Sequence, residues 1–94
     1  MNKNEAVITT KNVLNGKSIK WAFHYLEDNM WGFYDDDEII DETDYWVISI
    51  EEIINIESSL TNIIETMPYG YYAERKQGKW YIKKINENLS TDGN

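Results

Sequence analysis

The chain has 94 residues, of which 41% are hydrophobic and 14% aromatic, and it carries a net charge of -8 at pH 7. This length predicts one domain, with an ordered core at about residues 6–85 and a polar tail at 86–94. The chain contains no cysteine, which excludes disulfides, thiolate chemistry and a cysteine zinc site and favours a reducing cytoplasm. We expect no signal peptide, because the first residues are polar, and no apolar run is long enough to span a membrane.

The first half of the chain predicts three strands joined by turns. Residues 6–10 are β-branched, and Asn15-Gly16 marks a turn in the polar stretch that follows. Residues 19–25 alternate in character, which predicts a half-buried antiparallel strand. One side of this strand carries Ile19, Trp21, Phe23 and Tyr25, and the other carries Lys20, Ala22 and His24. Residues 30–34 predict the next strand, in which Gly32 marks a bulge or a close backbone approach.

The middle of the chain predicts an acidic surface loop followed by helices. The loop covers residues 35–44, and residues 45–48 form a short extended piece. Ser49 and Glu52 then have the spacing of a capping box, which starts a helix. The core face of that helix is marked by Ile50, Ile53, Ile54 and Ile56. A second serine cap, at Ser58 or Ser59, opens a short helix through Leu60, Ile63 and Ile64, which Pro68 stops.

The last part of the chain predicts a hairpin. Residues 69–75 and 80–85 form its strands, and residues 76–79 form its turn. Lys83 and Lys84 would discourage edge-to-edge pairing of the outer strand. The order of elements predicts an α+β fold, in which an antiparallel sheet of about five or six strands carries one or two short helices on one face.

The aromatic residues fall into two groups. Most are expected to pack in the core: Trp21, Phe23, Trp31, Phe33, Trp46, Tyr71 and Trp80. Others lie next to acids and loops and suit a protein interface: Tyr25, Tyr34, Tyr45, Tyr69 and Tyr72.

Charge is distributed very unevenly along the chain. No lysine or arginine occurs between Lys20 and Arg75, and this stretch holds most of the 17 acidic residues. If the acids form one exposed patch, its potential attracts a basic protein and repels nucleic acid and membrane phosphate. We therefore expect a basic protein partner, with no nucleic acid and no membrane.

The acidic loop and its aromatic neighbours form the predicted partner-binding site. Its residues are Tyr34, Asp35, Asp36, Asp37, Glu38, Asp41, Glu42, Asp44, Tyr45 and Trp46. The acids would supply steering and ion pairs, and the aromatic residues would supply buried anchors. The loop could instead be a merely solvated surface or a cation site. An EF-hand loop, however, needs a glycine at its sixth position and a glutamate at its twelfth, and neither is in place.

Catalytic motifs are nearly absent. His24 is the only histidine, with no cysteine to complete a triad or a metal site, so we interpret it as a surface or hydrogen-bonded structural residue. Gly70 lacks the lysine and hydroxyl residue of a phosphate loop, and paired carboxylates catalyse only within a cleft. Arg75 is expected to pair with an acid. We expect no catalytic residue, no cofactor and no metal.

Five segments together resemble the bacterial immunity protein 33 domain. They are residues 7–16, Trp31-Gly-Phe33, the acidic run from Asp35, residues 48–53 and residues 68–75, within a resemblance that spans roughly residues 6–85. The resemblance implies a small cytoplasmic α+β protein, without established catalytic residues, that neutralises a polymorphic or contact-dependent toxin. We therefore expect a non-enzymatic immunity-type binding protein. The alternative is a small-ligand-binding or regulatory domain, with Trp31, Trp46 and Tyr69 lining a pocket.

Overall fold

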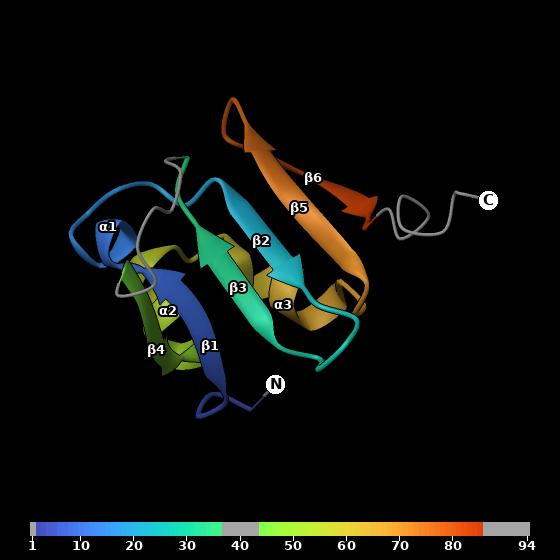
Figure 1. The fold of residues 1–94 in the computed structure, drawn as a ribbon. Coiled ribbons are helices and arrows are strands. Elements are labelled where there is room, and N and C mark those ends of the chain that lie inside the picture. Colours follow the sequence, from blue (N-terminus) through green and yellow to red (C-terminus); the bar gives the residue numbers. More distant parts are fainter. Residues whose placement is uncertain (1, 37–43, 86–94) are drawn as a thin grey trace.

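A computed structural model describes residues 2–36 and 44–85 (Figure 1). Four acids of the predicted site and the predicted tail at 86–94 lie outside the described residues; the acids are Asp37, Glu38, Asp41 and Glu42. In chain order the elements are β1 (Ala6–Thr10), α1 (Lys11–Leu14), β2 (Trp21–His24), β3 (Trp31–Tyr34), β4 (Tyr45–Ser49), α2 (Ile50–Ile56), α3 (Leu60–Thr66), β5 (Tyr71–Lys76) and β6 (Lys79–Lys84).

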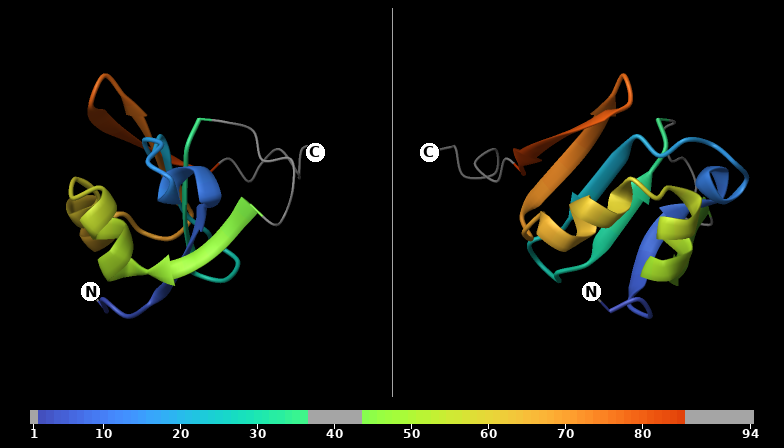
Figure 2. Two further views of the ribbon diagram at one scale, coloured as in Figure 1. Left: turned by 90° about the vertical axis from the view of Figure 1, so that its left-hand side faces the viewer. Right: turned by 180° about the vertical axis from the view of Figure 1, so that it is seen from behind.

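The strands form one six-stranded sheet in the order β4-β1-β3-β2-β5-β6. Helices α2 and α3 both lie on one face of it (Figure 2), so the predicted α+β class is confirmed. The sheet is not wholly antiparallel, however, because β1 runs parallel to β3, with Ile8 opposite Gly32. The cause is the β2–β3 hairpin, whose return strand lies beside β1 and runs in the same direction. As expected, β6 is an edge strand; β4 is the other edge.

The stretch after β1 forms a short helix where only a turn was expected. The side chain of Thr10 accepts a hydrogen bond from the amide of Val13 at 3.2 Å and so caps α1. The helix then ends near Gly16, whose φ of 110° is accessible to glycine at little cost. The predicted turn at Asn15-Gly16 is therefore the end of this helix.

The capping box at the start of α2 is confirmed. The amide of Glu52 donates to Ser49 Oγ at 3.1 Å, and the amide of Ser49 donates to Glu52 Oε1 at 2.8 Å. Ile50 and Ile53 are fully buried, but Ile56 is 44% exposed, so its assignment to the core face was wrong. With 3.6 residues in each turn, Ile56 is rotated by about 120° from Ile50. In the described part of the chain, no helix is long and apolar enough to cross a membrane.

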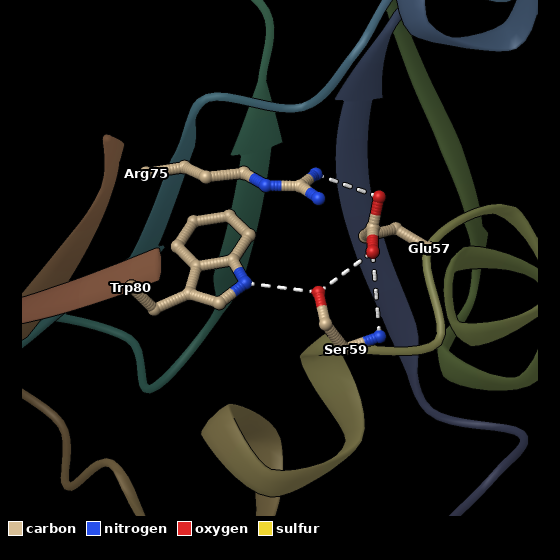
Figure 3. Close-up of polar contacts among 4 residues, drawn as sticks. All are labelled: Glu57, Ser59, Arg75 and Trp80. Carbon is tan, nitrogen blue, oxygen red and sulfur yellow. Dashed lines mark hydrogen bonds and ion pairs between the residues drawn. The ribbon is translucent and has the colours of Figure 1, made fainter. Parts of the chain in front are cut away.

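A polar cluster joins the β5–β6 hairpin to the junction of α2 and α3 (Figure 3). Arg75 Nη1 lies 2.7 Å from Glu57 Oε1, which confirms the expected ion pair. Ser59 occupies the N-cap position of α3, but its hydroxyl donates to Glu57 Oε2 at 2.6 Å and makes no capping bond. The indole of Trp80 donates to Ser59 Oγ at 2.9 Å. The cluster therefore holds the helices against the last two strands.

The two sides of β2 are reversed relative to the prediction. Ala22 is fully buried under the helices and lies opposite Phe33 and Ala73, which are also fully buried. Since paired residues of antiparallel strands share a face, Trp21 and Phe23 lie on the other side of the sheet. The alanines leave room for α2 and α3 to pack closely. Of the other predicted core aromatics, Trp31 is 4% exposed and Phe33 is fully buried, as expected, and Tyr71 and Trp80 pack partly buried against the core. Trp46 is 50% exposed on the edge strand β4, so its assignment to the core was wrong.

Candidate protein-binding surface

Aromatic side chains form a continuous layer on the sheet face opposite α2 and α3. We call this layer the aromatic face; it consists of Trp21, Phe23, Tyr25, Tyr34, Tyr45 and Tyr72. No helix of the described chain covers it (Figures 1 and 2). The strand pairing explains the layer, because Trp21 lies opposite Tyr34 and Phe23 lies opposite Tyr72. An uncovered aromatic layer of this kind is typical of an interaction site.

Phe23 lies at the centre of the aromatic face. Its ring centroid is 5.2 Å from that of Tyr72, 5.6 Å from that of Tyr25 and 6.0 Å from that of Tyr34. The first two pairs are stacked, and such contacts stabilise beyond the area that they bury. The rings therefore half-bury one another, although no helix within residues 2–36 and 44–85 covers them.

The hydroxyls of Tyr25 and Tyr34 are hydrogen-bonded to each other at 2.7 Å. Burial raises the pKa of Tyr34 well above its usual value, and the bond to Tyr25 raises it further. Burial also raises the pKa of Tyr25, although the bond to Tyr34 acts in the opposite direction. Both phenols are therefore neutral at physiological pH. They shape the surface and are poor proton-transfer groups.

A hollow of about 210 Å³ lies at the β4 end of the aromatic face. Its lining is formed by Ile8, Tyr34, Tyr45 and Val47. Val47 is 66% exposed and Tyr45 is 44% exposed, which is unusual for large apolar side chains in a strand. Pockets for small ligands usually have volumes of about 300–1,000 Å³. The hollow is therefore better suited to one protruding side chain of a partner than to a whole ligand.

The aromatic anchors predicted for the site separate onto two faces. Tyr34 and Tyr45 come together, with ring centroids 6.2 Å apart, although their strands are separated by β1. Trp46 pairs with Thr9 and therefore points to the helix side, so its place beside Tyr45 in one site was wrong. The prediction also missed Ile8 and Val47. Alternation along β4 could have indicated Val47, because it shares a side with Tyr45. Ile8 lies on β1, and only the pairing of β1 with β4 places it opposite Val47.

The predicted acidic residues do not all lie at the surface. Asp35 is only 2% exposed and accepts hydrogen bonds from Thr10 Oγ1 and Asn12 Nδ2, both at 3.1 Å. It therefore holds α1 in place and is unavailable for steering a partner, which corrects its assignment. Asp36 is exposed and lies 3.8 Å from Lys20 Nζ. Asp44 is partly exposed, next to Tyr45.

The carboxylates of the described residues do not form a single patch. Glu57 pairs with Arg75, and Glu74 lies 3.7 Å from Lys76 Nζ. Other acids are spread over the β2–β3 turn and both longer helices, at Glu27, Asp28, Glu51 and Glu65. The expectation of one concentrated patch therefore finds no support in residues 2–36 and 44–85.

His24 has a structural environment. Its ring nitrogens lie 3.0 Å from the Met67 carbonyl and 2.7 Å from Asn29 Oδ1, and its ring stacks on Trp31 at 3.8 Å. The interpretation as a hydrogen-bonded structural histidine is confirmed. Trp31 is 4% exposed within this stack. Among the described residues, no group of three or more acids and histidines could hold a metal ion.

Comparison of the chain with known protein families, curated proteins and solved structures found no match.

Proposed function

We propose that this chain is a non-enzymatic, immunity-type binding protein that neutralises a cognate bacterial toxin in the cytoplasm, with the aromatic face as its docking surface. The observation that carries the proposal is the exposed aromatic and apolar surface around the hollow, formed by Tyr45 and Val47 on an otherwise highly charged protein. Surfaces of this kind in small proteins are typical of protein–protein contacts. Tyrosine is also among the residues that most often dominate binding energy at an interface.

The net charge of -8 supports a basic partner. Charge of this kind speeds association and depends on salt, whereas buried anchors set the rate of dissociation. The acidic segment leaves β3 after Tyr34 and returns to β4 before Tyr45, so both of its ends adjoin the aromatic face. Its acids Asp37, Glu38, Asp41 and Glu42, together with Asp36 and Asp44, are the proposed steering groups.

The test uses a purified toxin, first of all one encoded by a neighbouring gene. We expect Tyr45→Ala to weaken binding by at least about tenfold through faster dissociation. The matched control is Tyr69→Ala, because Tyr69 is 52% exposed but contacts His24 outside the aromatic face. Equal effects of the two variants would refute docking on this face.

The steering groups need a separate experiment. Converting Asp36, Asp37 and Glu38 to their amides should slow association at low salt and leave the dissociation rate nearly unchanged. If the association rate and its salt dependence do not change, the segment is only a solvated surface. Docking on the aromatic face would still stand in that case.

A further inference from the structure

The pairing of β4 with β1 shows which backbone groups of this edge strand face away from the sheet. In the ladder between β1 and β4, the amide of Ile50 donates to the carbonyl of Glu5 at 2.9 Å. Hydrogen-bonded pairs alternate with non-bonded pairs in an antiparallel ladder, so Ile48 and Trp46 are the next residues of β4 that bond to β1. The residues between them turn their amides and carbonyls away from the sheet.

Those outward-facing residues are Tyr45, Val47 and Ser49. The amide of Ser49 is bound by Glu52 Oε1 at 2.8 Å, which agrees with its outward direction. Tyr45 and Val47 therefore present the free backbone edge of β4, and no further strand of the described chain lies beyond it. Such an edge is a template for another strand.

Side chains protect the opposite edge but not this one. The edge strand β6 carries Lys79, Lys83 and Lys84, all exposed, and lysine at an edge discourages pairing with other strands. In β4 the sequence Tyr45-Trp-Val-Ile-Ser49 has no charge and no proline. An unprotected apolar edge is a liability for a free protein, which is consistent with its use as a docking site.

The geometry points to β4 as the site where an extended, basic segment of the partner adds as a seventh strand and places one apolar side chain in the hollow. Tyr45 and Val47 supply both the free backbone groups and two walls of the hollow. Main-chain bonds would provide affinity, and the hollow would select the side chain. This assignment rests on the proposed function in that the partner is a protein.

The net charge favours a basic partner over a second copy of this chain as the strand that adds to β4. Two copies, each with a net charge of -8, would repel each other along a shared edge. The residues that border β4 in the sequence include the acids Asp44 and Glu51, and the chain as a whole has 17 acidic residues against nine lysines and arginines. A basic strand can form hydrogen bonds with the free backbone groups of β4 and is attracted by the negative charge of the protein.

The test uses a short synthetic peptide in which lysine alternates with valine. Its binding is followed through the fluorescence of the protein, since Trp46 on β4 is 50% exposed. The control peptide has the same side chains but is methylated on alternate backbone nitrogens, so it cannot complete the ladder. We expect binding of the first peptide, and binding at least about tenfold weaker for the second. Equal binding, or no binding of either, would overturn the assignment.

Proline variants of the two edge strands, β4 and β6, test the same assignment by changing the protein instead of the peptide. In the ladder between β5 and β6, the amide of Ile85 donates to the carbonyl of Gly70. By the same alternation, the backbone amide of Ile82 points away from the sheet, as that of Val47 does in β4. Both are β-branched and exposed, at 66% and 46%. Proline is tolerated where an edge amide faces solvent. Val47→Pro should weaken peptide binding at least about tenfold, whereas Ile82→Pro should not.

Circular dichroism establishes that both variants fold, and the methylated peptide tests the edge even if one does not. Equal weakening by the two variants would overturn the assignment, as would a dimer of the free protein that Val47→Pro dissociates. The assignment and the proposed function can fail separately. Peptide binding without neutralisation of any toxin would refute only the function. Neutralisation that survives Val47→Pro would refute only the edge.

Discussion

Gly32→Ala tests whether Tyr34 lies across the middle of β3, where it forms one wall of the hollow. A Cβ atom at Gly32 would lie 2.6 Å from Tyr34 Cζ and 2.8 Å from Tyr34 Cε2, and its closest contact would be the Tyr34 hydroxyl. The φ angle of Gly32 is not in the left-handed region, so the backbone itself accepts alanine. The phenol ring must therefore move. This movement would break its hydrogen bond to Tyr25 and its contact with Phe23.

The expected magnitude follows from these contacts. The lost hydrogen bond costs about 0.5–1.5 kcal/mol, and the lost aromatic pair costs a similar amount, about 0.5–1.5 kcal/mol. Alanine in place of glycine within a strand returns about 0.5–1 kcal/mol. Gly32→Ala should therefore lower the free energy of unfolding by about 0.5–2 kcal/mol. In a Tyr34→Ala background the clash is absent, and the same change should stabilise the protein by about 0.5–1 kcal/mol.

Urea unfolding of the four proteins of this double-mutant cycle measures the coupling free energy between the two positions. We expect a coupling of about 1–3 kcal/mol. If Gly32→Ala has the same effect in both backgrounds, Tyr34 does not lie across Gly32. The described shape of the hollow would then be incorrect.

Three further predictions concern stability. Ser49→Ala removes one half of the capping box and should lower the free energy of unfolding by about 1 kcal/mol, measured in urea. Asp35→Ala should cost about 1–3 kcal/mol, because it leaves the buried Thr10 hydroxyl and the partly buried Asn12 amide without their acceptor. Asp36 is exposed, so Asp36→Asn should change stability by less than about 0.5 kcal/mol. Equal effects of the two variants would contradict the burial of Asp35. Burial raises the pKa of Glu57, but hydrogen bonds from Ser59 and Arg75 outweigh it and hold the pKa below its ordinary value of 4.5. The Glu57 carboxylate therefore stabilises the fold above that value, and the contribution disappears as the pH falls through the folded-state pKa. Unfolding followed as a function of pH should show a steeper acid loss for the native chain than for Glu57→Gln, and parallel curves would refute this linkage.

Most secondary-structure elements could be predicted because their signals are local. The capping box of Ser49 and Glu52 depends on groups three residues apart. The hairpin turn depends on Gln77 and Gly78, whose φ values of 53° and 80° suit a tight turn between strands. Interactions of this range are contained in the sequence itself. The parallel pairing of β1 with β3 could not be predicted, since it depends on where a distant hairpin docks.

The binding site could be predicted only in part, because some of its residues depend on contacts with distant parts of the chain. Tyr34 and Tyr45 were expected together and are together, because each begins or ends a strand beside the acidic segment. Asp35 shows the opposite outcome. It belongs to a run of acids that looks uniformly exposed, but its neighbours in space are Thr10 and Asn12, more than twenty positions away.

The chain's own pattern was sufficient to predict, within residues 19–25, a strand with one aromatic side and one side of smaller or polar residues; the strand itself is Trp21–His24. Which side the helices cover depended on the assembled sheet. Alternation shows that a strand has two different faces but not which of them is buried. Hydrophobicity alone predicted that the helices would cover the aromatic side, which was wrong. Ala22 and Ala73 pair across neighbouring strands and let α2 and α3 pack closely. The larger rings are consequently on the face opposite α2 and α3, where we propose that a partner binds.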